Sequence, residues 1–305
     1  MIAWTSFVVD SRTSKVYSVA NGGHQDYAGN EVDMLDLERA QPVWSQLLTP
    51  TPDAQLTNCQ PFYADGSPTA RHTYYGATLN QFNDRIMLFG GVWWCTGGGF
   101  FGGVSSYNIA ANSYNGAGTH PNLVDPFVVM PAVSLNPLTG DVYFAGSGQL
   151  GRWNRSTNTF TANLSPTGSG AAGGGTMSAF DTARGRILFL GGNGLDHHVY
   201  TLASNAWSTI TVTGANAANV SSLQQAALVY VPTLDVYLVR DGSSGGAVYQ
   251  INPTTFVATP FTTTGGTAIP PTLNGPFNKF LYVPRLQGAV YVPSPNGNAW
   301  FLRLH

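Results

Sequence analysis

Short apolar runs alternate with turn residues along the whole chain, and the alternation forms a repeating unit. Each unit has an apolar strand, a turn containing Asp, Asn, Gly or Pro, and a second apolar strand that ends in small residues. Such runs, rich in Val, Ile, Tyr and Phe and bounded by turn residues, are typical of β-strands. The second strands are predicted at residues 15–20, 85–89, 141–146, 186–190, 235–239 and 289–293.

The second half of each unit has a large residue followed seven positions later by an aromatic one. Turn-forming residues such as Ser156, Thr157 and Asn158 lie between the two. This spacing fits two short antiparallel strands joined by a tight turn, with both bulky side chains in one layer. The pairs are Leu37 and Trp44, Tyr107 and Tyr114, Trp153 and Phe160, Tyr200 and Trp207, and Tyr249 and Phe256.

Together the two halves make a four-stranded meander, and repeats of roughly 45 to 65 residues are typical of propeller blades. We therefore predict an all-β, six-bladed β-propeller of four-stranded antiparallel blades, in a single domain over residues 1–305. The blades are expected near residues 1–50, 70–118, 128–165, 174–213, 223–262 and 276–305. The last blade shows only three strands, so we expect it either to be incomplete or to take a fourth strand from residues before Met1.

The repeat resembles a known motif. A Gly-Gly pair, then Tyr or Trp, then an aromatic residue seven positions later is similar to the kelch motif. The pairs are Gly22-Gly23, Gly90-Gly91 and Gly191-Gly192, and the pattern weakens at Arg240-Asp241-Gly242 and Pro293-Ser294-Pro295. The resemblance covers essentially the whole chain and implies a kelch-type propeller, as in the galactose-oxidase central domain. It implies little about function, because propellers host many unrelated activities.

Composition narrows the classes of partner. Of the 305 residues, 43% are hydrophobic, 12% aromatic and only 9% charged, with a formal net charge of −2. This balance gives no electrostatic reason to expect a nucleic acid or an anionic membrane as partner. No run approaches the roughly 18 apolar residues of a membrane span, and no signal peptide is visible. A neutral polar surface suits a polysaccharide or an oligosaccharide as the partner. We expect the protein to be secreted or extracellular, and to be a monomer.

Candidate functional residues gather on one face of the predicted propeller. With strands lettered a to d in each blade, the b–c loops and the d–a crossovers lie on one face, here called the loop face. The a–b and c–d turns lie on the opposite face, here called the turn face. Histidines, arginines and aromatic residues concentrated on a loop face mark a candidate site. The candidates, together with the acidic and amide residues beside them, are His24, Asp26, Tyr27, Arg71, His72, Tyr74, Trp93, Trp94, Gln149, Arg152, Asp196, His197, His198, Arg240 and Asp241, with His120 if its crossover turns inward.

The first functional hypothesis is lyase-type β-elimination on a polysaccharide, possibly one containing uronates. His24, Tyr27, His72 and Tyr74 would supply the base and the acid. Aromatic rings stack on sugar faces and arginine grips carboxylates in bidentate fashion. The substrate-binding residues would be Arg71, Trp93, Trp94, Gln149, Arg152, His197 and Arg240.

Two further hypotheses stay open. A divalent metal such as zinc, copper or manganese, held by His24, Asp26, His72 and His198, would point to an oxidoreductase or a hydrolase. The third is a non-catalytic module that binds a glycan or a protein on the same face. Against all three stands a structural role for these residues, with Asp26 capping a turn and Arg71 holding a crossover by contacts with carbonyl groups.

The two cysteines, Cys59 and Cys95, fall in neighbouring loop regions of the predicted propeller. Two thiols cannot form a disulfide framework, and a structural zinc site would need two more ligands. We expect one disulfide that pins the tryptophan-containing loop, as would fit an oxidising compartment.

Overall fold

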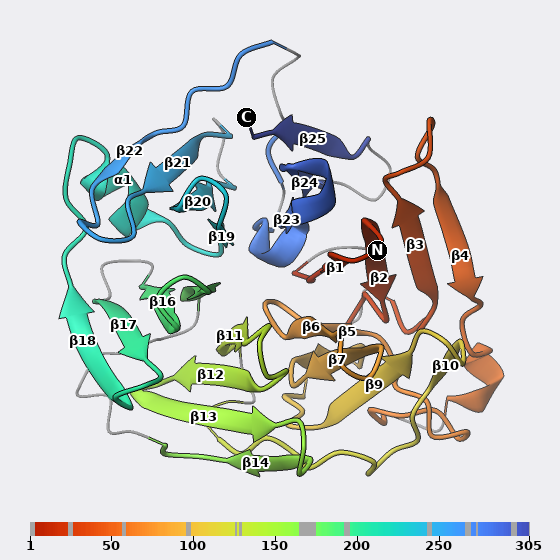
Figure 1. Cartoon of the computed structure of the whole chain (residues 1–305). Coiled ribbons are helices and arrows are strands. Elements are labelled where there is room, and N and C mark those ends of the chain that lie inside the picture. The colour runs from red at the N-terminus through yellow and green to blue at the C-terminus, as the bar shows by residue number, and fades with distance from the viewer. Residues whose placement is uncertain are drawn as a thin grey trace.

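The protein is a β-propeller whose blades are arranged around a central axis (Figure 1). The computed structural model describes residues 4–23, 27–56, 59–95, 99–125, 127, 130–164, 175–191, 196–242, 246–265, 270–272, 274–293 and 298–304. Within these ranges, five antiparallel sheets have four strands and a sixth has three. The predicted all-β, six-bladed propeller is thereby confirmed, and the last blade has three strands among the described residues.

The strands follow the order of the chain from blade to blade. Blade one holds β1 (Val8–Asp10), β2 (Lys15–Val19), β3 (Val32–Asp36) and β4 (Trp44–Leu48). Blade two holds β6 (Ala77–Asn80), β7 (Arg85–Phe89), β9 (Val104–Asn108) and β10 (Ser113–Tyr114). Blade three holds β11 (Ala132–Leu135), β12 (Val142–Gly146), β13 (Gln149–Asn154) and β14 (Thr159–Thr161).

The remaining blades repeat this arrangement. Blade four holds β15 (Met177–Asp181), β16 (Arg186–Leu190), β17 (His197–Thr201) and β18 (Ala206–Ile210). Blade five holds β19 (Ala227–Val231), β20 (Val236–Arg240), β21 (Val248–Ile251) and β22 (Ala258–Pro260). Blade six holds β23 (Phe280–Val283), β24 (Gly288–Tyr291) and β25 (Trp300–Arg303).

Short elements lie in the connections between blades. A two-stranded ladder joins β5 (Arg71–His72) to β8 (Val92–Trp93) on the loop face. The helices are α1 (Ala217–Ser222) and the 3-10 turns η1 (Asp53–Gln55), η2 (Phe277–Lys279) and η3 (Pro284–Leu286). Among the described residues, no helix has the length and apolar character needed to cross a membrane.

The ring is closed by direct contact between blades six and one. The innermost strands β1, β6, β11, β15, β19 and β23 contact one another in that cyclic order. An apolar cluster of Phe7, Val16 and Leu35 from blade one packs against Val283 and Val290 of blade six. Since buried apolar area is the main stabilising term, these interfaces hold the ring together.

The seven-residue spacing found in the sequence has a structural cause in three blades. Residues seven apart are direct cross-strand partners where the c–d turn has its regular length. The ring centroids of the paired residues are 5.5 Å apart in blade two and 5.7 Å apart in blade four. Blade three pairs its own two aromatic residues in the same register. The paired residues are Tyr107 and Tyr114, Trp153 and Phe160, and Tyr200 and Trp207.

Blades one and five depart from that pairing. Trp44 lies opposite Leu35 rather than Leu37, because Leu37 already belongs to the c–d turn. Tyr249 pairs with Pro260, while Phe256 lies in the turn with a positive φ of 54°. The spacing alone therefore predicted the hairpins but not the register of these two.

The shortest b–c connection is in blade three. Only Ser147 and Gly148 join β12 to β13, with φ values of 44° and 78°. Positive φ at both central residues is the signature of a type I′ hairpin, whose twist matches that of the strands.

Ion pairs between neighbouring blades lie on the turn face. Arg12 of blade one contacts Asp84 of blade two, and Arg184 of blade four contacts Asp235 of blade five. Arg285 of blade six reaches Glu38 of blade one at 2.7 Å. Several of the scarce charges are thus used to connect blades.

The predicted disulfide is confirmed. Cys59, in the crossover from blade one to blade two, is bonded to Cys95, and their Cα atoms are 5.4 Å apart. The bridge ties the crossover to the b–c loop of blade two.

Candidate functional site

Arg71 lies at the start of blade two and is fully buried. Its guanidinium donates to the carbonyl oxygens of Gly90 and Gly103 and to Oγ of Ser105, at 3.1–3.4 Å. Burial lowers the pKa of Arg71 to about 10. The side chain holds the crossover to the b–c loop through carbonyl contacts, which is the structural role anticipated as the alternative. Its binding role stays a prediction.

His72 and Tyr74 lie near one another in a cluster of rings. The ring centroids of His72 and Tyr74 are 6.0 Å apart, and that of Trp4 is 5.0 Å from His72. Tyr74 also contacts Phe277 of blade six at 5.6 Å. His72 is only 2% exposed, and burial raises the pKa of Tyr74 above its usual value. The structure therefore brings two of the four predicted catalytic residues together, in a largely enclosed place.

The tryptophan loop of blade two forms an aromatic cluster. Trp93 packs edge-on against Phe101 at 5.9 Å, and Phe101 packs against Phe62 at 5.4 Å. Trp93 and Trp94 are half-buried, whereas the neighbouring Phe100 is 56% exposed. A partly exposed cluster of this kind is compatible with the predicted stacking platform.

The sequence predicts Gln149 and Arg152 in the loops of the loop face, and this prediction is wrong. Both lie within strand β13, because the two-residue turn before it leaves no longer loop. Gln149 is the first residue of the strand and pairs with Gly146, while Arg152 pairs with Tyr143 and Thr161. Both side chains are half-buried.

His197 and His198 begin strand β17 and point to opposite sides, as adjacent strand residues do. Nε2 of His197 lies 2.9 Å from Oγ of Ser221 in α1. His198 lies edge-on to the ring of Trp207 at 5.7 Å. Burial lowers the pKa of both histidines below the usual value, so both imidazoles are neutral at pH 7. His197 therefore lies beside α1, while His198 faces the outer strand of its own blade.

Arg240 ends strand β20 and repeats the arrangement of Arg71. Its guanidinium donates to the carbonyl oxygens of Asp241, Ala247 and Pro270, at 2.9–3.4 Å. Its Cζ atom lies 4.8 Å from the centroid of the Tyr291 ring, and the residue is 0% exposed. Burial lowers its pKa. Like Arg71, it connects the loops of the loop face.

The b–c loop of blade one, between β2 and β3, is described only in part. His24 and Asp26, predicted as catalytic and metal-binding residues, lie outside the described residues. Tyr27 is 37% exposed, and its pKa is raised to about 12, first by burial and then by Glu31. Among the described residues, which include His72 and His198, no group of three or more histidines, cysteines or acidic residues is placed to hold a metal ion.

His120 does not turn toward the loop face. Its Nδ1 lies 2.8 Å from Oδ1 of Asn158, which belongs to a c–d turn, and its Nε2 lies 2.8 Å from Oγ of Ser106. The crossover therefore carries this histidine to the turn face, against the side of blade three.

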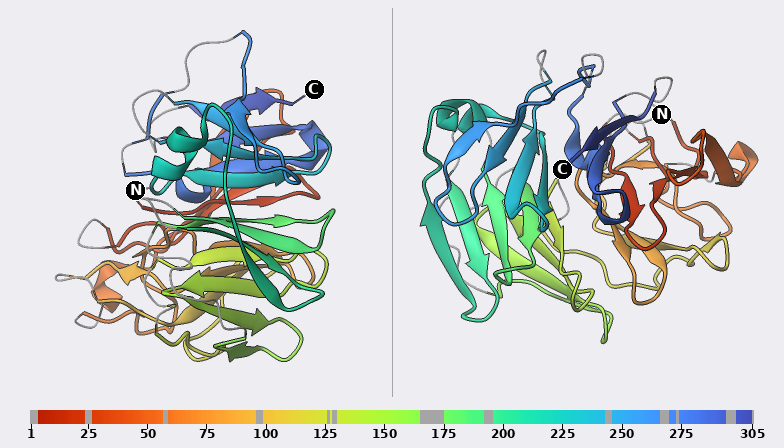
Figure 2. Two further views of the ribbon diagram at one scale, coloured as in Figure 1. Left: turned by 90° about the vertical axis from the view of Figure 1, so that its left-hand side faces the viewer. Right: turned by 45° about the horizontal axis from the view of Figure 1, so that its top comes forward.

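A pocket opens on the loop face of blade five, with a volume of about 460 Å³. Seen edge-on in the left view of Figure 2, α1 lies on one side of the disc, and it forms one wall of the pocket. Asp241 comes from the b–c loop and Tyr249 from β21. The lining residues are Asn219, Ser222, Leu223, Gln224, Asp241 and Tyr249.

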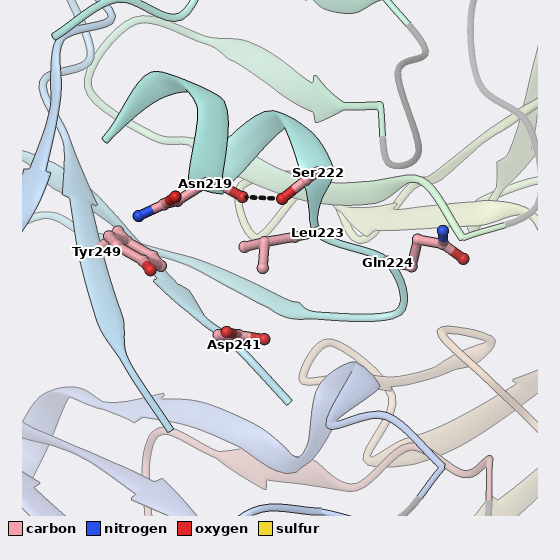
Figure 3. Close-up of a pocket in the computed structure, with 6 residues that line it drawn as sticks. All are labelled: Asn219, Ser222, Leu223, Gln224, Asp241 and Tyr249. Carbon is pink, nitrogen blue, oxygen red and sulfur yellow. Dashed lines mark hydrogen bonds between the residues drawn. The ribbon is translucent and has the colours of Figure 1, made fainter. Parts of the chain in front are cut away.

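The lining of the pocket is mostly polar, and Asp241 is the charged residue among those that form it. Figure 3 shows Leu223 between α1 and the Asp241 carboxylate, with Tyr249 on one side and Gln224 on the other. Oγ of Ser222 donates to the carbonyl oxygen of Asn219 at 2.8 Å. Two amides, one hydroxyl, one carboxylate and one aromatic ring thus surround the space.

Of these lining residues, only Asp241 is predicted from the sequence to lie on the loop face. The residues of α1 lie between the predicted blades four and five. A signal was present, because Ala217 and Ala218 favour a helix and Val220 and Leu223 are apolar at a spacing of three. These two apolar residues are buried, which leaves Asn219 and Ser222 exposed beside the pocket.

Comparisons with known proteins add the following. No family model matches the sequence, and no curated protein matches it. Among solved structures, the chain is similar to one in the crystal structure of a nidogen/laminin complex. The TM-score is 0.48 and the sequence identity 10%, over 81% of this chain and 75% of that one.

Proposed function

We propose that this propeller binds a polysaccharide or an oligosaccharide on its loop face, in the pocket of blade five. One observation carries the proposal: neutral amides and a hydroxyl surround an aromatic ring in a space of about 460 Å³. Small-ligand sites typically occupy roughly 300–1,000 Å³. Asn219, Ser222 and Gln224 offer donors and acceptors for sugar hydroxyls, and the ring of Tyr249 offers a surface for C–H groups.

The cellular setting belongs to the same proposal. The Cys59–Cys95 disulfide supports a secreted or extracellular location, because disulfides persist in oxidising compartments. The paired aromatic residues of blades two to four support a kelch-type ancestry for the blades. We propose a monomer, which size-exclusion chromatography with light scattering would check.

Binding is tested by titration calorimetry with a panel of neutral and charged oligosaccharides. A double variant, Asn219→Ala with Gln224→Ala, removes two exposed amides from the pocket. The matched control is Gln46→Ala, which removes an exposed amide from β4 of blade one. We expect the double variant to weaken binding on the order of tenfold, at about 1.4 kcal/mol, and the control to leave it unchanged. Equal affinities for all three proteins would reject the pocket as the binding site.

A second candidate function is cleavage of the bound polymer by β-elimination. It is favoured by the closeness of the His72 and Tyr74 rings, whose centroids are 6.0 Å apart. Tyr74 keeps its proton at neutral pH and could protonate the leaving oxygen, while His72 could accept a proton. Release of unsaturated products, followed by their ultraviolet absorbance, would be lost in His72→Gln and Tyr74→Phe. Cleavage that survives both substitutions would exclude this pair as the acid and base.

A further inference from the structure

The third strand of blade six, β25, has the exposure of an outermost strand (Figure 1). None of its residues is fully buried, as is also true of β18 and β4, the outermost strands of blades four and one. The third strands of blades two and four, β9 and β17, are instead buried at all but their last residue. Among the described residues β25 pairs with β24 alone, whereas the other five blades have a fourth strand on the third. One edge of β25 therefore presents main-chain donors and acceptors that no described strand uses.

Two partly exposed aromatic rings lie at the outer end of the seam between blades six and one. Phe301 of β25 lies opposite Val290 of β24 and is 41% exposed. Trp44 of β4 lies opposite Leu35 of β3, and its ring centroid is 5.8 Å from that of Phe7. Val290, Leu35 and Phe7 belong to the apolar cluster that joins the two blades. A strand added to β25 would place a side chain beside Phe301 and extend this cluster outward.

The same side of β25 carries a cation. Arg303 is two positions from Phe301, so both side chains point to one side of the strand. Arg303 is exposed and makes no ion pair within the described part of the chain. On an antiparallel neighbour, the residues opposite these two are also two positions apart. A fitting strand thus carries an acidic residue opposite Arg303 and, two positions closer to its C-terminus, an apolar residue opposite Phe301.

We propose that β25 accepts an extended segment of a partner protein as the fourth strand of blade six, with its acidic and apolar residues in this order. Main-chain hydrogen bonds along the open edge supply affinity, and the alternate side chains supply specificity. The outermost strands of the other blades run antiparallel to the third, so the added strand does the same. No residue of β25 lines the blade-five pocket, so this inference does not depend on the proposed function.

The first test uses a synthetic peptide with blocked ends, Thr-Glu-Val-Leu-Val-Thr, and the 305-residue protein. Fluorescence anisotropy of the labelled peptide measures binding. Two further peptides carry N-methyl groups, one on the first, third and fifth residues and the other on the second, fourth and sixth. In an antiparallel ladder only alternate residues direct their N–H groups to the neighbouring strand. We expect one methylated peptide to lose binding and the other to keep it. Binding that survives in both would overturn the inference.

A charge exchange locates the site on β25. Replacing the glutamate of the peptide by lysine should weaken binding about two- to fivefold, and Arg303→Glu in the protein should reverse that preference. A preference that Arg303→Glu leaves unchanged, or no binding of the glutamate peptide to the unaltered protein, would refute the proposal.

Phe301→Ala tests the apolar contact, and should weaken binding of the glutamate peptide on the order of tenfold. The matched control is Phe82→Ala, at a 51% exposed ring in a turn of blade two, which should leave binding unchanged. Equal effects of the two substitutions would contradict the placement of the peptide on β25. A dimer in light scattering that Phe301→Ala dissociates would overturn the inference in favour of a second copy of the chain as the occupant.

Discussion

The phenol of Tyr107 donates a 2.5 Å hydrogen bond to Oδ1 of Asn112, five residues further along the chain. Nδ2 of the same asparagine donates to the carbonyl oxygen of Leu47 in blade one, at 2.8 Å. Trp153 with Asn158, and Tyr200 with Asn205, repeat the first contact in the next two blades. One turn residue thus connects its own strand to the preceding blade.

Replacing Asn112 is therefore expected to destabilise the propeller in two ways. Asn112→Ala removes both hydrogen bonds and also places alanine at a φ of 49°, in the left-handed region. Asn112→Gly removes the same bonds without the backbone strain. We expect a loss of about 1–3 kcal/mol for alanine and a smaller loss for glycine, measured by urea unfolding. Equal losses in both variants would show that backbone strain has no part in the effect.

A second prediction concerns Asp181, which lies at the turn-face end of β15 and whose side chain is fully buried. Its carboxylate contacts Arg184 and Arg186 and accepts a hydrogen bond from Tyr237, at 3.1–3.2 Å. Removing one partner of a buried ion pair leaves buried charge uncompensated, so Asp181→Ala should cost about 3–5 kcal/mol.

The matched control is Asp84→Ala, which breaks an exposed pair with Arg12. That pair should be worth only about 0–1 kcal/mol, because solvent screens it. Urea unfolding at low and high salt measures both variants. Similar losses at the two positions would contradict the assignment of Asp181 as a buried anchor.

A third prediction follows from the buried amine of Lys279. Burial lowers its pKa to about 7 from the usual lysine value of 10.5. Between these values the unfolded chain binds a proton that the folded protein lacks, so stability rises with pH. Because one pKa unit corresponds to about 1.4 kcal/mol, several kcal/mol are gained from pH 7 toward pH 10.

Lys279→Met should flatten this dependence, and Lys15→Met serves as a control on β2. Urea unfolding between pH 7 and 9.5 measures the slope while avoiding the range in which buried tyrosines ionise. The three histidines with lowered pKa values titrate below this window. An unchanged slope in Lys279→Met would refute the assignment.

The fourth prediction concerns the disulfide. Cys59 and Cys95 are 36 positions apart, and a loop of that size is worth about 3–4 kcal/mol in the chain-entropy treatment. Cys59→Ser with Cys95→Ser should lower the free energy of unfolding by about that amount. Non-reducing peptide mapping checks the bond itself. A wild-type protein whose stability is indifferent to reduction would contradict this role.

The sequence predicted the parts of the fold that depend on local pattern. The runs at residues 85–89 and 186–190 are strands with the predicted bounds, because each is apolar and bracketed by turn residues. The register of the blade-five hairpin was not predictable, since it depends on Phe256 adopting a turn conformation.

The candidate site was harder to predict from the sequence than the fold. The pattern placed Arg71 and Arg240 on the loop face but could not show that their guanidinium groups turn inward to main-chain carbonyls. Side-chain direction at a loop depends on which oxygens the neighbouring loops present, and that is set only in three dimensions. The same holds for His120, whose position depends on Asn158 of the next blade.

The turn of Ser147 and Gly148 has a consequence for engineering. Two residues suffice to close a blade between its middle strands, as β12 and β13 demonstrate. The connection between β7 and β9, residues 90–103, is far longer than closure demands. That extra chain carries β8, which pairs with β5, and Cys95, which is bonded to Cys59. Shortening it toward a Ser-Gly turn would therefore remove the ladder and the disulfide that fasten the crossover from blade one.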